Sequence, residues 1–261
     1  MLVFVIPLKS PQAAKSWSQV SKLFERCVKS LCSQTSSDFR VLVVCNEKPY
    51  IQFSHPNILY LEVDLPIPQP TWEDRKRDKE QKLLMGLVHA RKLEPSYIMP
   101  VDADDCLSKH LVEFVNRNSH CNGWFVSKGY EYQEGSRLIY LRQEDFYVRC
   151  GSCNIIRYNL LNLPENINYD KPRQFYQEHG RVRKFMDKQG TPIEPLPFPA
   201  VVYITEHGEN NYYQKGFGVD NPRMTHNPNK FMMVLKKAYK TLNSRPLSPT
   251  IRDEFSLYAL R

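Results

Sequence analysis

Residues 97–105 read Tyr97-Ile98-Met99-Pro100-Val101-Asp102-Ala103-Asp104-Asp105, and this stretch decides the fold. Its first five residues form a short apolar run after Pro95, which is typical of a central β-strand. The three carboxylates that follow repel one another unless water, hydrogen bonds or a cation intervenes. The strand therefore runs directly into a cluster of charge that needs a partner.

A divalent cation would relieve this repulsion. Carboxylate oxygens suit Mg²⁺ or Mn²⁺, which complete their octahedron with water and substrate phosphates. The alternative is that Asp104 or Asp105 only caps a helix that begins near Cys106 or Ser108. The local sequence favours neither interpretation, so the choice depends on the surrounding elements.

Strands and helices alternate around this stretch. Further strands are expected at residues 2–6, 39–45 and 58–63. The spacing of apolar residues predicts a helix over 16–33 that starts with a capping box, and a second amphipathic helix follows the basic run 75–79. This order implies an α/β fold with a doubly wound, mostly parallel sheet, in which ligands bind beyond the carboxyl ends of the strands.

The composition is that of an ordinary globular protein with an excess of basic residues. The chain has 261 residues and a formal net charge of +8, which suits partners that carry phosphate. It contains no apolar run near the roughly 20 residues that span a bilayer, and its start lacks the features of a signal peptide. The seven cysteines, an odd number, are typical of reduced thiols. We therefore expect a cytoplasmic protein.

Two pairs of segments resemble family 2 glycosyltransferases. Residues 30–35, Ser-Leu-Cys-Ser-Gln-Thr, precede an Asp-Phe pair at 38–39, and this is similar to the helix and second strand of that family. Residues 82–90 followed by 97–105 are similar to the region of its DXD motif. The resemblance implies a GT-A (nucleotide-diphospho-sugar transferase) fold: a mostly parallel central sheet flanked by helices, with an irregular acceptor-side half.

The resemblance also implies a function and a division of the chain. We expect a metal-dependent, hexosyltransferase-like enzyme that moves a sugar from a nucleoside-diphosphate sugar to an acceptor hydroxyl with inversion. Residues 1–115 would form the nucleotide-sugar-binding half of the GT-A domain, and residues 116–225 the acceptor and catalytic half of the same domain. Residues 226–261 would form a C-terminal helical tail.

The nucleotide and metal residues follow from the same resemblance. Asp104 would be the primary ligand of Mn²⁺ or Mg²⁺, while Asp102 would contact the ribose or a metal-bound water. The base and ribose would be held by the loop after the first strand and by the end of the second strand, at Pro7, Leu8, Lys9, Asn46 and Glu47. The family commonly has acidic residues at the position of Asn46-Glu47, so the identity of the base stays open.

Cations at the start of the second helix would add to this site. Arg75, Arg77, Lys79 and Lys82 are candidates to face the diphosphate, with a solvated charged face as the alternative for each of them. We assign Lys82 to the nucleotide site.

A general base and a third metal ligand are expected in the second half. Transfer to a hydroxyl needs a group that removes its proton, and residues 177–190 resemble the family's Glu-Asp motif and following helix. Glu178 is the candidate base, and His179, which stands where the family has Asp, is the second candidate. His207 follows an expected strand at 201–204 and would be a metal ligand, with an ordinary loop histidine as the alternative.

Three further features have competing interpretations. Tyr130 and Tyr132 could stack on an acceptor sugar or pack in the core. The pair Cys150 and Cys153 has metal-site spacing but lacks a second pair, so a turn near the acceptor pocket is favoured. A basic helix over 229–242 could make peripheral contact with a membrane face, which would suit a lipid-linked acceptor, or could pack on the domain.

Two other functions compete with glycosyl transfer. A nucleotidyltransferase on a related sheet would need a glycine-rich phosphate loop, and residues 7–11 contain no glycine. A non-enzymatic carbohydrate-binding or nucleic-acid-binding protein would suit the charge and the aromatic residues, but the acidic cluster is misplaced for binding phosphate without a metal. We therefore expect a saccharide or lipid-linked acceptor and no nucleic acid as the partner.

Overall fold

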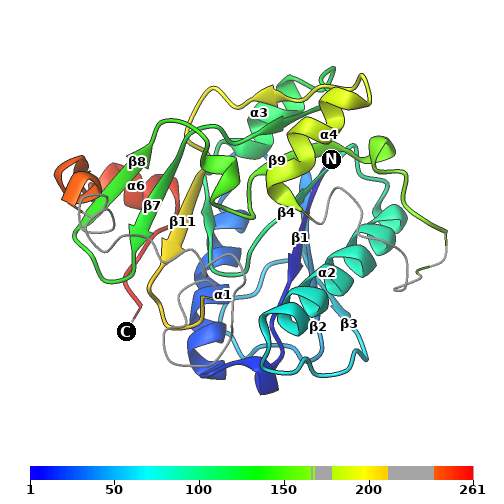
Figure 1. Ribbon diagram of the computed structural model, residues 1–261, viewed down its shortest axis with the longest axis horizontal. Coiled ribbons are helices and arrows are strands. Elements are labelled where there is room, and N and C mark those ends of the chain that lie inside the picture. Colours follow the sequence, from blue (N-terminus) through cyan, green and yellow to red (C-terminus); the bar gives the residue numbers. More distant parts are fainter. Residues whose placement is uncertain (166, 168–177, 211–237, 261) are drawn as a thin grey trace.

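A computed structural model describes residues 1–165, 167, 178–210 and 238–260 of the chain. Its main sheet has seven strands in the order β10-β6-β9-β4-β1-β2-β3 (Figure 1). The strands are β1 (Leu2–Pro7), β2 (Phe39–Cys45), β3 (Ile58–Glu62), β4 (Tyr97–Pro100), β6 (Gly123–Phe125), β9 (Asn154–Arg157) and β10 (Glu194–Pro195). Strands β3, β2, β1 and β4 are parallel, and β9 runs antiparallel between β4 and β6.

Helices cover both faces of this sheet because successive side chains of a strand point to opposite sides. Phe4 and Ile6 pack in one core cluster with α1 (Trp17–Cys32), whereas Val3 and Val5 pack in a second cluster with α2 (Trp72–His89). The predicted α/β fold, with a mostly parallel central sheet flanked by helices, is confirmed.

The helix starts follow from local capping. Ser16 accepts a hydrogen bond from the backbone N–H of Gln19, as the predicted capping box requires. Helix α2 begins earlier than the basic run, because the Thr71 side chain caps it by accepting from the backbone N–H of Asp74. Residues 75–79 therefore lie inside the helix, one turn beyond its start.

A second sheet of five strands, in the order β12-β8-β7-β11-β5, lies beside the first. Its strands are β5 (Cys106–Leu107), β7 (Gly129–Gln133), β8 (Leu138–Arg142), β11 (Val201–Thr205) and β12 (Ser244–Pro246). Tyr130 and Tyr132 are buried in the core cluster of this sheet, so the core-packing interpretation holds for both. Glu131, the residue between them in the strand, is also buried and forms ion pairs with Arg142 and Lys240.

Short elements complete the described chain. The remaining helices are α3 (Leu111–Arg117), α4 (Val182–Lys188) and α6 (Pro249–Glu254), and single 3-10 turns occur at Pro11–Ala13, Ala90–Leu93, Phe146–Val148, Tyr158–Leu161 and His179–Arg181. Strands from both predicted halves, 1–115 and 116–225, share the seven-stranded sheet. Most of the expected basic helix over 229–242 lies outside the described residues. Among the helices that are described, none has the length and apolar character needed to cross a membrane.

Candidate active site

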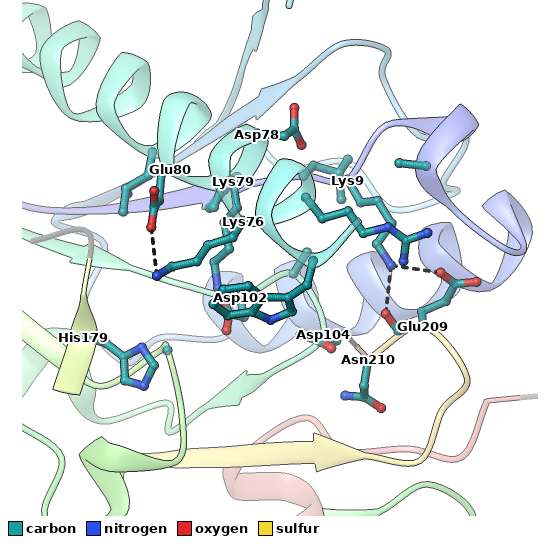
Figure 2. A pocket seen from close by; sticks show the side chains of 18 of the residues that line it. Lys9, Lys76, Asp78, Lys79, Glu80, Asp102, Asp104, His179, Glu209 and Asn210 are labelled. Atoms are coloured by element: carbon teal, nitrogen blue, oxygen red, sulfur yellow. Dashed lines mark hydrogen bonds and ion pairs between the residues drawn. The ribbon is translucent and has the colours of Figure 1, made fainter. Parts of the chain in front are cut away.

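A cleft of about 460 Å³ lies at the carboxyl ends of the parallel strands. The chain continues from β1 to β2 and β3 on one side of β1 and then returns to β4 on its other side, so the strand order reverses between β1 and β4. This is the point at which open α/β sheets bind ligands. The loops after β1 and β4, one face of α2 and the loop after β11 contribute lining residues (Figure 2).

Strand pairing brings the acidic cluster to the loop after β11. β5 follows the cluster directly and pairs antiparallel with β11, with Cys106 opposite Val202. The residues before Cys106 therefore approach the residues after Val202. His207 Nε2 lies 2.7 Å from Asp104 Oδ2. Asp104 and His207, which the sequence analysis assigned to one site, do lie together and both line the cleft.

The contacts of His207 define its chemical role. Its Nδ1 accepts a hydrogen bond from the backbone N–H of Glu209 at 3.2 Å, so the ring proton is on Nε2 and is donated to Asp104. A histidine that binds a metal through one ring nitrogen normally donates N–H from the other. In this arrangement His207 orients the Asp104 carboxylate through Nε2, and its role as a metal ligand stays a prediction.

Asp104 is held as a carboxylate. Burial opposes its ionisation, but the hydrogen bond from His207 and the nearby Lys79 ammonium outweigh it and keep the pKa of Asp104 below its ordinary value.

Asp105 is a structural residue and not a helix cap. It is fully buried, and its carboxyl accepts hydrogen bonds from Ser152 Oγ at 2.6 Å, Cys150 Sγ at 3.2 Å and the backbone N–H of Ile204 at 3.3 Å. Burial, followed by the charges of Asp104 and Asp102, raises its pKa well above the ordinary value. The cap interpretation is wrong because β5 follows at once and the next helix begins only at Leu111.

The turn at residues 150–153 supports Asp102, the first residue of the acidic cluster. Ser152 Oγ accepts from the backbone N–H of Asp102 at 2.8 Å, and a Cβ on Gly151 would lie 2.4 Å from Asp102 Oδ2. An alanine at this position would therefore displace the Asp102 carboxylate. The cysteines at both ends of the turn are buried free thiols, consistent with the predicted turn.

The cations of α2 separate into two groups. Lys79 lines the cleft and forms an ion pair with Asp102. Lys82 is fully buried: its ammonium donates to the backbone oxygen of Leu8 and to Asp78 Oδ2, both at 2.9 Å, and it does not line the cleft. The assignment of Lys82 to the nucleotide is therefore corrected, since its ammonium is used to hold the loop after β1.

Lys9 and Glu209 join the two sides of the cleft. Lys9 Nζ lies 3.0 Å from Glu209 Oε2, and Glu209 Oε1 also accepts from the backbone N–H of Ser16 at 2.8 Å. Burial lowers the pKa of Lys9, although the Glu209 carboxylate partly opposes that shift. Sequence reasoning missed Glu209, although it stands two residues from His207 in the same polar loop.

Of the other residues predicted to hold the base and ribose, some line the cleft and some do not. Pro7 and Leu8 line the cleft with Lys9, as expected. Asn46 and Glu47 do not: the Asn46 amide donates to the backbone oxygen of Leu65 at 2.8 Å, and Glu47 is exposed.

The predicted catalytic pair lies on the far wall. Glu178 and His179 both line the cleft, and Figure 2 shows His179 at the opposite end from Lys9 and Glu209. Glu178 Oε2 lies 2.9 Å from Arg181 Nε, and the backbone oxygen of His179 accepts from Asn154 at 3.0 Å. The cleft thus has an end bounded by Lys9 and Glu209 and an end bounded by Glu178 and His179.

Comparisons with known proteins give structural matches alone. No protein-family model and no curated protein matches the chain. The structure is similar to TarS 1–349 of S. aureus, with 12% identity and a TM-score of 0.47, over 78% of this chain and 60% of that chain. The same fragment in complex with UDP-GlcNAc matches at 12% identity and a TM-score of 0.47, over 82% of this chain and 61% of that chain.

A further match is the bifunctional IspDF from Campylobacter jejuni, with 12% identity and a TM-score of 0.39, over 80% of this chain and 50% of that chain. This chain therefore spans 60% to 61% of the TarS fragments.

Proposed function

We propose that the chain is a GT-A-type glycosyltransferase that moves a sugar from a nucleoside-diphosphate sugar to an acceptor hydroxyl. One observation carries the proposal: Asp102 and Asp104 lie at the switch point of the sheet, in one cleft with the loop after β1 and a row of cations on α2. Such a cleft suits a ligand with a neutral or apolar part and a diphosphate.

The cations match the charge that develops during this reaction. Breaking the bond between sugar and diphosphate leaves negative charge on the departing phosphate, which positive groups fixed in advance stabilise. Lys9, Arg75, Lys76 and Lys79 line the cleft. Lys79 is the candidate for this role, because its ammonium is already held beside Asp102.

A divalent cation fits the remaining donor atoms. Within the described ranges no group of three His, Cys, Asp or Glu side chains is placed to hold a metal ion. Mg²⁺ and Mn²⁺, however, commonly take one or two carboxylates together with substrate phosphates. We assign Asp104 and Asp102 as those carboxylates, and the bound ion would neutralise phosphate charge.

Residues of the far wall would handle the acceptor. Glu178 is the proposed base that takes the proton of the acceptor hydroxyl, with His179 as the alternative, and the transfer would proceed with inversion. The acceptor would be a saccharide or a lipid-linked sugar. The proposed location is the cytoplasm, with or without contact with a membrane face.

Donor turnover tests this proposal. The protein is incubated with a panel of nucleoside-diphosphate sugars and Mn²⁺, and products are followed by ³¹P NMR. We expect slow release of nucleoside diphosphate and free sugar even without an acceptor, because water can replace the hydroxyl. In a parallel incubation with nucleoside triphosphates and sugar 1-phosphates, release of pyrophosphate would instead indicate a nucleotidyltransferase. No turnover with any donor, together with salt-sensitive RNA binding, would indicate a binding protein.

A further inference from the structure

A lysine is already paired with one of the two proposed metal ligands. The Lys79 ammonium forms an ion pair with Asp102 Oδ1, and the two side chains are 41% and 24% exposed. The turn at Gly151 covers another side of the same carboxylate, because a Cβ on Gly151 would lie 2.4 Å from Asp102 Oδ2. A cation that enters from the cleft would therefore meet Lys79 at this carboxylate.

The neighbouring lysine of α2 is paired differently. Lys76 also lines the cleft, but its ammonium lies 3.5 Å from Glu80 Oε1, one turn along the same helix (Figure 2). Lys79 instead reaches from α2 to the loop after β4, which carries the acidic cluster. The two lysines carry the same charge in the same cleft, and Lys79 is the one placed to act on the proposed metal site.

An ammonium and a divalent cation compete for one carboxylate. Two positive groups held against the same oxygen atoms repel each other strongly near a protein surface. Mn²⁺ or Mg²⁺ bound by Asp102 and Asp104 would therefore displace the Lys79 ammonium. A diphosphate in the cleft offers that ammonium new acceptors, since phosphate oxygens accept charge-assisted hydrogen bonds from lysine.

We propose that Lys79 is an exchangeable counter-ion of the metal site, which holds Asp102 until a divalent cation and a diphosphate bind together. This inference rests on the proposed function. Without a nucleotide, the metal breaks the ion pair with no new partner for the ammonium, so it binds weakly. With a nucleotide, Lys79 moves from the carboxylate to the phosphates. The metal and the nucleotide then raise the affinity of the cleft for each other by the same factor.

Manganese affinity in the absence of nucleotide tests this inference. Free Mn²⁺ is followed by electron paramagnetic resonance during titration of wild type, Lys79→Met and Lys76→Met. We expect Lys79→Met to bind Mn²⁺ at least about 5-fold more tightly than wild type, because the competing charge is gone. Lys76→Met is the matched control, since it removes the same charge from the same helix and cleft but breaks an ion pair with Glu80. Its affinity for Mn²⁺ should stay within about 2-fold of wild type.

Nucleotide affinity should change in the opposite direction. Calorimetry with UDP, GDP, CDP and ADP at saturating Mn²⁺ should show that the tightest of them binds Lys79→Met at least about 5-fold more weakly than wild type. A general loss of folded protein would weaken the binding of both ligands, so it cannot produce this pair of changes.

The outcomes separate this inference from the proposed function. Equal Mn²⁺ affinity in Lys79→Met and wild type, an equal gain in Lys76→Met, or unchanged nucleotide affinity in Lys79→Met would overturn the inference alone. If neither wild type nor Lys79→Met bound Mn²⁺ or any of the four nucleotides, the proposed function would be overturned with it.

Discussion

Asp105→Ala should destabilise the fold more than any other change in the acidic cluster. The substitution removes the acceptor of three hydrogen bonds, from Ser152, Cys150 and Ile204. Two strong donors, the Ser152 hydroxyl and the Ile204 amide, would be left in a buried place, and each costs about 1–3 kcal/mol when unsatisfied. The thiol is a weak donor and adds little.

The sum predicts a loss of about 2–6 kcal/mol, a large fraction of the roughly 5–15 kcal/mol that stabilises a typical protein. Urea unfolding followed by circular dichroism measures it directly. Asp105→Asn is the matched control. It keeps an oxygen for the Ile204 amide, and it resembles the neutral acid that burial favours at this position, so it should cost about 1 kcal/mol or less. Equal stability of Asp105→Ala and wild type would refute the assignment of Asp105 as a buried structural acceptor.

Three further predictions concern neighbouring features. Glu131→Gln should cost about 2 kcal/mol at neutral pH. The ion pairs of Glu131 outweigh burial and lower its pKa in the fold, so this difference should start to shrink as the pH falls below the unfolded value near 4.5 and should vanish below the folded pKa. Gly151→Ala should weaken nucleotide binding because its Cβ displaces the Asp102 carboxylate, whereas Gly180→Ala, whose Cβ meets open space in the same cleft, should not. Glu178→Gln should reduce turnover far more than donor affinity.

Separate measurements check these three predictions. Urea unfolding as a function of pH tests the first, and a wild-type advantage that persists in acid would contradict it. Calorimetry of both glycine variants with a nucleoside diphosphate tests the second, which fails if the two bind alike. Steady-state kinetics test the third, and near-normal turnover would transfer the role to His179.

The sequence was sufficient where local rules decide the outcome. The capping pair at Ser16 and the apolar runs of the parallel strands follow from residue types and spacing. The place of Asp102 at a strand end then followed from the alternation of strands and helices. These features depend on neighbours within a few residues.

Other features depended on contacts between distant segments. Asp105 has the residue type of a helix cap, and only the pairing of β5 with β11 makes it a buried acceptor. Lys79 and Lys82 lie one turn apart on α2, but a difference in helical phase directs one into the cleft and the other under the loop after β1. The burial of Tyr130 and Tyr132 required knowledge of a second sheet that the irregular second half did not reveal.

Binding of a nucleoside diphosphate in the presence of Mn²⁺ tests the central claim most directly. Thermal unfolding of wild type and Asp104→Ala is compared with and without Mn²⁺ and a panel of nucleoside diphosphates, since a ligand bound only by the folded state raises its stability. We predict that one nucleotide with Mn²⁺ raises the midpoint of wild type and leaves that of folded Asp104→Ala unchanged. The same stabilisation in both proteins, or none in wild type, would contradict a nucleotide-sugar site built on Asp104.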